Sequence, residues 1–152
     1  WWHIGVRPRT VGPCGSCWHE YPGTIRRRII GGTMEQTVLL VDDHPDSRGL
    51  IRRNVEAMGL TGATKIFRRD ATDLGPAGRN DGFGLVFIDP PYGQGLGEKA
   101  LASAIVGGWL LPGTVIVVEE AREATVALPA GVSLLDRREW GGTQAVFARL
   151  GG

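Results

Sequence analysis

The stretch that decides the fold is Leu85-Val86-Phe87-Ile88-Asp89-Pro90-Pro91-Tyr92. Its four leading apolar residues are rich in β-branched and aromatic types, and they predict a strand buried on both faces, as in the middle of a parallel sheet. Asp89 then lies at the carboxyl end of this strand, the edge where open α/β sheets bind ligands. The two prolines fix φ and remove two backbone donors, so we expect an extended chain whose carbonyl groups can accept hydrogen bonds.

This corner suits methyl transfer to an amino group on a planar base. Such an amino group is a poor nucleophile because its lone pair is delocalised into the ring. Asp89 and the Pro90 carbonyl could accept its two N–H bonds and orient the lone pair, while Tyr92 stacks on the base. Residues 89–92 resemble motif IV, Asp/Asn-Pro-Pro-Tyr/Phe, of S-adenosylmethionine-dependent methyltransferases that act on nucleic acids. The alternative is a tight turn with a surface acid.

Length and composition indicate an ordinary globular protein. The 152 residues, 42% hydrophobic and 22% charged, are enough for one domain with a sizeable core. No apolar run approaches the roughly 20 residues of a spanning helix, and the amino terminus lacks a signal-peptide pattern, so we expect a cytoplasmic protein with no membrane partner. The net charge of +1 does not argue for nucleic-acid binding by itself. Arginine runs at 26–28, 52–53, 68–69 and 137–138 suit either phosphate contacts or a solvated surface.

Residues 1–37 look unlike the rest of the chain, and we expect them to be an atypical, disordered or frame-shifted segment before a methyltransferase domain at 38–150. They hold a CxxC pair, Cys14 and Cys17, with His3 and His19 nearby. No second pair completes the spacing of a zinc site, and the strand and helix that flank a redox CxxC are missing. We therefore expect no metal.

From Glu35 onward, strands alternate with helices. Asp46 or Asp43 could cap a helix over 46–58, whose apolar positions Ile51, Val55 and Met58 follow helical spacing before the stop signal Gly59. The predicted strands are 38–41, 63–67, 85–88, 114–118, 132–138 and 145–150, and a second helix spans 98–106. This order predicts a doubly wound α/β sheet that ends in an antiparallel hairpin across Gly141-Gly142.

Three of these strands are followed by an acid, and the three acids could serve a nucleoside-bearing cofactor. Asp42 could accept both ribose hydroxyls, as the acid after the second strand does in dinucleotide folds. Asp70 could accept from the adenine amino group, and Asp89 would face the methyl group and its acceptor. Each acid alone could equally be a helix cap or a loop acid.

From about Glu35 to Leu150 the chain resembles the bacterial 16S ribosomal RNA guanine-N2 methyltransferases, the RsmD-like proteins. The matching stretches are 38–42, 51–55, Asp70-Ala71, 86–92, 108–110, Val118-Glu119 and Trp140-Gly141. The resemblance implies a Rossmann-like methyltransferase fold, S-adenosylmethionine as methyl donor, and guanine in 16S ribosomal RNA or the assembling small subunit as acceptor. It also implies the site residues: Asp42, with Asp43 beside it, on the ribose, Asp70-Ala71 on the adenine side, and Asp89, Pro90, Pro91 and Tyr92 as the catalytic motif.

The sequence departs from the family before Val38. A first strand followed by a glycine-rich loop, which lets the backbone approach the methionine end of the cofactor, is not recognisable, nor is the basic amino-terminal arm. One explanation is a frame shift or misplaced start, which would leave the sheet without its normal first strand. The other is that Thr24–Gly32 forms a divergent first strand and glycine turn. Three other functions stay open: a catalytically inactive RNA-binding remnant, methylation of a small-molecule or protein amine, and a receiver-like signalling domain suggested by residues 39–45.

Overall fold

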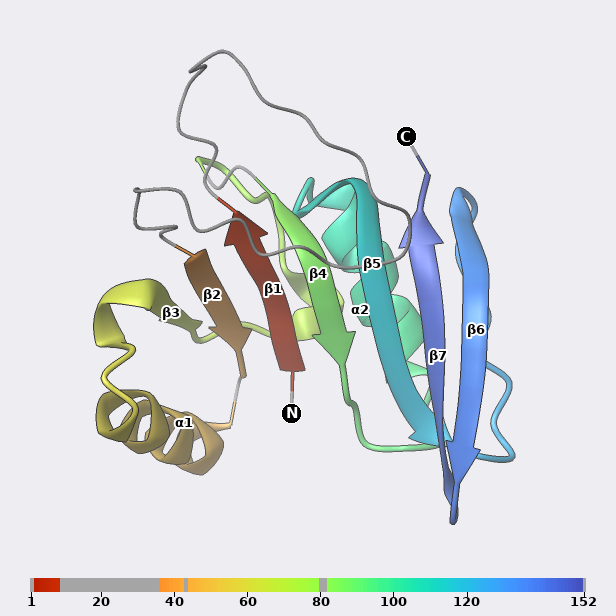
Figure 1. Ribbon diagram of the computed structural model, residues 1–152, viewed down its shortest axis with the longest axis horizontal. Helices are drawn as coiled ribbons and strands as arrows, with labels where there is room; N and C mark the ends of the chain where they lie inside the picture. Colours follow the sequence, from red (N-terminus) through yellow and green to blue (C-terminus); the bar gives the residue numbers. More distant parts are fainter. Residues whose placement is uncertain (1, 9–35, 43, 80–81, 152) are drawn as a thin grey trace, which may run out of the picture.

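The computed structural model describes residues 2–8, 36–42, 44–79 and 82–151. They form one seven-stranded sheet in the order β3-β2-β1-β4-β5-β7-β6 (Figure 1). The strands are β1 Trp2–Pro8, β2 Gln36–Val41, β3 Thr64–Phe67, β4 Phe83–Ile88, β5 Leu110–Ala121, β6 Val132–Trp140 and β7 Thr143–Leu150. The helices are α1 Pro45–Ala57 and α2 Leu96–Val106, with 3-10 turns η1 Thr61–Ala63 and η2 Ala71–Asp73.

The pairing of the strands confirms the predicted α/β sheet with a terminal hairpin. β2 pairs in parallel with β3, and β4 with β5, while β7 runs antiparallel to both β5 and β6. Because β1 is antiparallel to both of its neighbours, β2 and β4 point the same way. The carboxyl ends of β2, β3, β4 and β5 therefore meet at one edge of the sheet, and in Figure 1 the arrows of β2, β4 and β5 point to it.

The position between β2 and β4 holds an unexpected strand. A Rossmann-like sheet places its first strand here in parallel, but β1 runs antiparallel and has an irregularity between Ile4 and Val6. The prediction that the normal first strand is missing is confirmed for the described residues, in which β1 occupies its place. The facing backbone groups of β2 and β4 require partners, and β1 provides them. Residues 24–32, offered as a divergent first strand, lie outside the described residues, as do Cys14 and Cys17.

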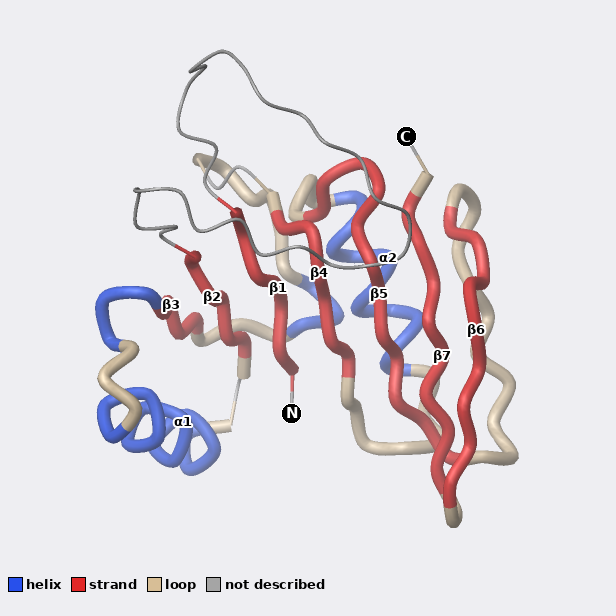
Figure 2. Tube along the Cα trace, in the orientation of Figure 1, coloured by secondary structure: helices blue, strands red, loops and turns tan. Residues whose placement is uncertain are grey.

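Two apolar clusters hold the helices against the sheet. The larger lies between α2 and the sheet, and Trp109 and Val86 are among its fully buried members. On the opposite face, α1 packs through Ile51 and Val55 against Leu40. The tube in Figure 2 shows α1 next to β2 and β3, with α2 behind β4 and β5.

Two burial predictions were wrong. Phe87 is 44% exposed, so β4 is not buried on both faces. Val86 and Ile88 point to the α2 side, whereas Phe87 points to the face that no described helix covers at this position. Met58 is 61% exposed because α1 ends at Ala57, one residue before it.

The helix and strand ends lie within four residues of expectation, and the start of β5, at Leu110 instead of 114, differs most. His44, not Asp46, occupies the N-cap position of α1 and makes no side-chain capping hydrogen bond, because the fixed φ of Pro45 suits the first helical position and starts the helix earlier. Asp46 lies in the first turn, where the helix dipole favours an acid, and Asp43 lies outside the described residues. β3 ends at Phe67, so Asp70 follows the strand by three residues. As predicted, Gly59 adopts a left-handed conformation after α1, with φ 68°.

Candidate active site

The structure places the predicted acids along one edge of the sheet. Asp42 follows β2 directly and Asp89 follows β4 directly. Between them lies the Trp2 end of β1, whose backbone pairs with Val41 on one side and Ile88 on the other. Since neighbouring strands are about 4.8 Å apart, the chain positions of the two acids are about 10 Å apart. With Asp70 beyond β3, their order along the edge is Asp70, Asp42, Asp89.

Asp42 is held where β2 turns into α1. It is 5% exposed, and its Oδ1 accepts a hydrogen bond of 2.7 Å from the backbone N–H of His44. The Arg48 guanidinium donates to its backbone oxygen at 3.2 Å. The second carboxylate oxygen receives no hydrogen bond from the described residues. This Asx turn presents a fixed acceptor at the sheet edge.

Asp70 caps the turn after β3. Its Oδ1 accepts from the backbone N–H of Thr72 at 2.8 Å and from the hydroxyl of Thr72 at 2.7 Å. Ala71 is 1% exposed, so the start of η2 is fixed to the core. The structure thus gives Asp70 the capping role that the sequence left as an alternative, and its other oxygen accepts no hydrogen bond from the described residues.

Arg69 has a packing role next to this turn. Its guanidinium carbon lies 5.7 Å from the ring centroids of both Phe67 and Trp109, and it donates a hydrogen bond to the backbone oxygen of Leu74. The two rings meet edge to face with their centroids 6.1 Å apart. This arginine is exposed, and it also packs against the segment around η2.

The Asp89-Pro90-Pro91-Tyr92 motif leaves β4 and crosses to α2. Pro90 is buried where α2 approaches closely, because Gly97 carries no side chain. A Cβ on Gly97 would lie 3.1 Å from Val118 Cγ1 and 3.6 Å from Pro90 Cγ. Pro91 is exposed and the Tyr92 side chain is 39% exposed. The motif thus has one anchored proline and one accessible ring, as a stacking platform requires.

Two glutamates at the end of β5 contact this motif and the residue after it. The Tyr92 hydroxyl donates to Glu119 Oε1 at 2.7 Å. The backbone N–H of Gly93 donates to Glu120 Oε1 at 2.8 Å, and the same oxygen accepts from the Ala121 N–H at 2.8 Å. Sequence reasoning placed the two acids at a strand end but assigned them no role. The sequence could have indicated a role for one of them, because successive residues of a strand point to opposite faces of the sheet. One of the two glutamates therefore had to be buried.

The pKa of Tyr92 is raised above the ordinary 10.0. The main cause is the hydrogen bond to the Glu119 carboxylate, which holds the phenol proton. A hydrogen bond with Thr143 acts in the opposite direction, while desolvation and the negative charges of Glu119 and Asp89 act with the main cause. At neutral pH Tyr92 is therefore a hydrogen-bond donor and not a base.

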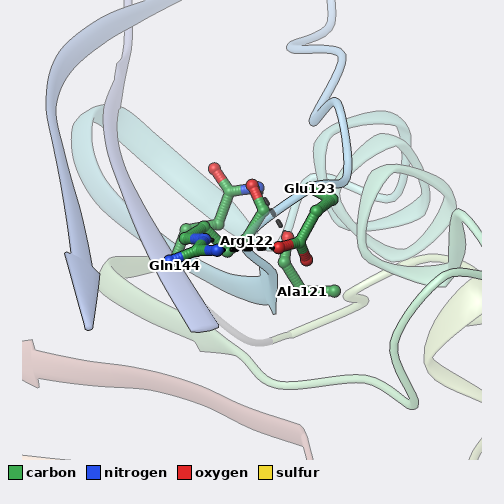
Figure 3. Close-up of polar contacts among 4 residues, drawn as sticks. All are labelled: Ala121, Arg122, Glu123 and Gln144. Atoms are coloured by element: carbon green, nitrogen blue, oxygen red, sulfur yellow. Dashed lines mark hydrogen bonds and ion pairs between the residues drawn. The ribbon is translucent and has the colours of Figure 1, made fainter. Parts of the chain in front are cut away.

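Gln144, a second residue that the sequence did not single out, is fully buried beside the end of β5. Its side-chain nitrogen donates to the carbonyl oxygen of Ala121 at 2.7 Å, with a longer contact of 3.3 Å to that of Arg122 (Figure 3). The same nitrogen also donates to the carbonyl oxygen of Ala124 at 2.6 Å. Its Oε1 is buried without a hydrogen-bond partner among the described residues. Gln144 therefore fixes the chain that leaves β5.

Comparison with known proteins identifies the family. The model of the family described as Conserved hypothetical protein 95 matches residues 30–149. The chain belongs to this family. Membership confirms the resemblance to RsmD-like methyltransferases over the range predicted from the sequence, and it contradicts the receiver-like alternative.

Curated relatives of the family match part of the chain. An uncharacterized methylase of Rickettsia prowazekii is 31% identical over 70 residues, covering 46% of this chain and 30% of the relative. The ribosomal RNA small subunit methyltransferase D of Buchnera aphidicola is 23% identical over 88 residues, covering 58% of this chain and 46% of the relative. The aligned parts thus span less than half the length of either relative.

A solved structure of similar architecture confirms the predicted α/β fold. HI0767 of Haemophilus influenzae, a candidate methylase, superposes with a TM-score of 0.68 at 19% identity and covers 76% of this chain and 73% of that one. The shared architecture is the mixed α/β sheet of a Rossmann-like methyltransferase.

S-adenosylmethionine, the methyl donor expected for this family, has a nucleoside half and a methionine half, and the described residues can be compared with what each half requires. Asp42 and Asp70 each have one carboxylate oxygen that accepts no hydrogen bond from the described residues. Within residues 36–42, 44–79 and 82–151 there is no glycine-rich loop between a parallel first strand and a helix, so no residues there match the methionine half.

In the same ranges no three His, Cys, Asp or Glu side chains gather to hold a metal ion, and no helix is long and apolar enough to cross a membrane.

Proposed function

We propose that this chain carries out, or is part of a protein that carries out, S-adenosylmethionine-dependent methylation of the exocyclic N2 amino group of a guanine in 16S ribosomal RNA. The carrying observation is the position of Asp89-Pro90-Pro91-Tyr92 at the carboxyl edge of the sheet, next to Asp42. Membership of a methyltransferase family supports the reaction, and the relative named ribosomal RNA small subunit methyltransferase D supports the substrate. The assembling small subunit, in the cytoplasm, is then the expected partner.

In this proposal the motif aligns the amino group. Asp89 and the Pro90 carbonyl accept its two N–H bonds, and Tyr92 stacks on the guanine. When bound, S-adenosylmethionine supplies a methyl group on a sulfonium, whose S–C bond breaks as the N–C bond forms. The Asp89 carboxylate takes the proton that the nitrogen then loses. Alignment of this kind can lower a barrier by about 7–11 kcal/mol at best.

The other edge residues would bind the nucleoside of the methyl donor. Asp42, with Asp43 beside it in sequence, would accept from the ribose hydroxyls. Asp70 would accept from the adenine amino group through the oxygen that does not cap η2, and buried Ala71 would shape that side of the pocket. The proposal also includes the division of the chain into an atypical segment at 1–37 and a methyltransferase domain at 38–150.

A second candidate function is a catalytically inactive RNA-binding remnant of such an enzyme. The observation that favours it is the antiparallel β1 in the central position, where an active member has a parallel strand that leads into the glycine-rich loop. A chain of this kind would keep the fold and lose the methyl donor. Methylation of a small-molecule or protein amine is the third possibility, because the motif specifies a planar amine better than it specifies RNA.

The first experiment is calorimetric binding of S-adenosylhomocysteine, with Asp42→Ala as the test variant and Asp46→Ala as its matched control. Asp46 lies exposed in the first turn of α1 and away from the strand end. Micromolar binding that Asp42→Ala loses and Asp46→Ala keeps supports the cofactor site. A folded chain without binding supports the remnant.

The second experiment is methyl transfer to 16S ribosomal RNA and to small subunits, followed by nucleoside analysis. N2-methylguanosine is the expected product. Binding of the cofactor without methylation of either substrate would overturn the proposed acceptor and favour a different amine.

A further inference from the structure

The loop that follows the Asp-Pro-Pro-Tyr motif passes the end of β5, where two consecutive carboxylates meet it. Glu119 and Glu120 are successive residues of an extended strand, so their side chains lie on opposite faces of the sheet. Burial confirms this alternation, because Val118 and Glu120 are 2% and 4% exposed whereas Glu119 is only half-buried. The loop is therefore approached by one acid from each face.

Each acid makes a different contact with the loop. Glu119 accepts from the Tyr92 hydroxyl at 2.7 Å, a contact to a side chain. Glu120 accepts from the Gly93 N–H at 2.8 Å, a contact to the backbone. Adjacent loop residues are thus bound by adjacent strand residues, 27 positions further along the chain.

We propose that Glu119 and Glu120 are positioning residues that hold Tyr92 and Gly93 on opposite sides of the end of β5 and so fix the loop that carries Asp89. We call this pair of contacts the Glu119–Glu120 clamp. The inference deepens the proposed methyl transfer and rests on it for its catalytic consequence. The structural part of it stands on the hydrogen bonds alone.

Glu120 gives the stronger support for the clamp because its side chain is almost fully buried. A buried carboxylate is costly unless hydrogen bonds satisfy it, and here one oxygen receives two backbone N–H groups. Hydrogen bonds to an ionised acceptor are roughly twice as strong as neutral ones. The Gly93 amide therefore has a strong, specific partner at a point where Tyr92 and Gly93 are otherwise exposed.

The strand end that bears the clamp is itself held in place. Glu120 is the register partner of Gln144 on β7, and the Gln144 amide binds the carbonyl groups of Ala121 and Ala124. The carboxylates are thus carried by a rigid segment on both sides of Glu120. A rigid support matters because small misplacements of a reacting group cost large factors in rate.

The decisive experiment follows the Gly93 amide by NMR hydrogen exchange in the full chain. Glu120→Ala should speed this exchange about tenfold or more, as expected for the loss of a hydrogen bond to a charged group. Glu120→Gln keeps a carbonyl oxygen and should restore most of the protection. Glu123→Ala is the matched control, since Glu123 is an exposed acid that pairs with Arg122.

A double-mutant cycle tests the other half of the clamp. Glu119→Ala and Tyr92→Phe remove the same hydrogen bond from its two ends, so their effects on Gly93 exchange should be non-additive. This cycle also carries the test if Glu120→Ala does not fold. Additive effects, or unchanged Gly93 exchange in folded Glu120→Ala, overturn the clamp.

The effect of the clamp on catalysis is tested by measuring the rate of methyl transfer in the same variants. Glu120→Ala should lower kcat about tenfold or more, with partial rescue in Glu120→Gln, while S-adenosylhomocysteine affinity changes less than twofold. Faster Gly93 exchange with unchanged kcat overturns the positioning role. A wild-type chain without any transfer refutes the proposed function instead, and the Gly93 exchange then decides the clamp by itself.

Discussion

Among single residues, Asp89 has the most direct predicted part in the chemistry. Asp89→Ala removes the carboxylate that orients the amino group and takes its proton, so methyl transfer should fall about 100-fold or more. The affinity for S-adenosylhomocysteine should change little, because Asp42 and Asp70 are the expected nucleoside contacts. Asp89→Asn keeps an acceptor oxygen and should fall less. The measurement is initial-rate transfer beside calorimetric binding, and equal rates in Asp89→Ala and wild type would refute the role.

Tyr92 allows a test at the same scale by pH titration. Its pKa is raised above 10.0, first by the hydrogen bond to Glu119, so the folded state favours the protonated phenol. The stabilisation that this proton gives is fully present below pH 10 and is lost as the pH rises through the folded pKa. Tyrosinate absorbance, taken as wild type minus Tyr92→Phe, should show a midpoint above 10. Glu119→Gln should move that midpoint down, and an unmoved midpoint would contradict the assigned cause.

At the scale of elements, the end of α2 depends on a glycine. A Cβ on Gly107 would overlap the Gly75 carbonyl oxygen and lie 2.7 Å from Trp109 Cδ1, while the Trp109 indole N–H donates to the same carbonyl at 2.7 Å. Its φ of −72° permits alanine, so the cost is purely one of space. Gly107→Ala should lower the free energy of unfolding by about 1–3 kcal/mol in urea titrations. Gly62→Ala meets no atom within 4 Å and is the control; equal midpoints for both would refute the packing argument.

Across the whole molecule, stability should be uneven, because α1 rests on a small cluster and α2 on a large one. Ile51→Ala removes one of the two buried residues of α1 and should cost about 2 kcal/mol, the low end for a core truncation. In the wild type the α1 amides should exchange through a local opening of lower free energy than the opening of β5 and β7, and Ile51→Ala should speed the α1 exchange about 30-fold. Native-state hydrogen exchange measures both, with exposed Met58→Ala as the control. Equal opening free energies for α1 and β5 in the wild type would mean that α1 opens only with global unfolding.

Much of the architecture was accessible from the sequence because it depends on local patterns. The run 85–88 had to be a strand that stops at Asp89, since two prolines cannot continue a ladder. Ile51 and Val55 share one face of a helix whatever surrounds them. Errors arose where a neighbour overrode a local preference: Pro45 moved the start of α1 to the residue after His44, and Phe87 faces a side of the sheet that no described helix covers there.

By itself, the sequence determined an α/β chain with an Asp-Pro-Pro-Tyr motif at a strand end, because hydrophobic period and proline geometry act over a few residues. The methyltransferase family followed from the resemblance of that motif and its neighbouring stretches to the family, not from these local patterns. Only the tertiary structure decided that β1 fills the centre of the sheet in the antiparallel sense and that Glu119 and Glu120 reach Tyr92 and Gly93. Those contacts join residues far apart in the chain. Their existence depends on strand order and register, which no local pattern encodes.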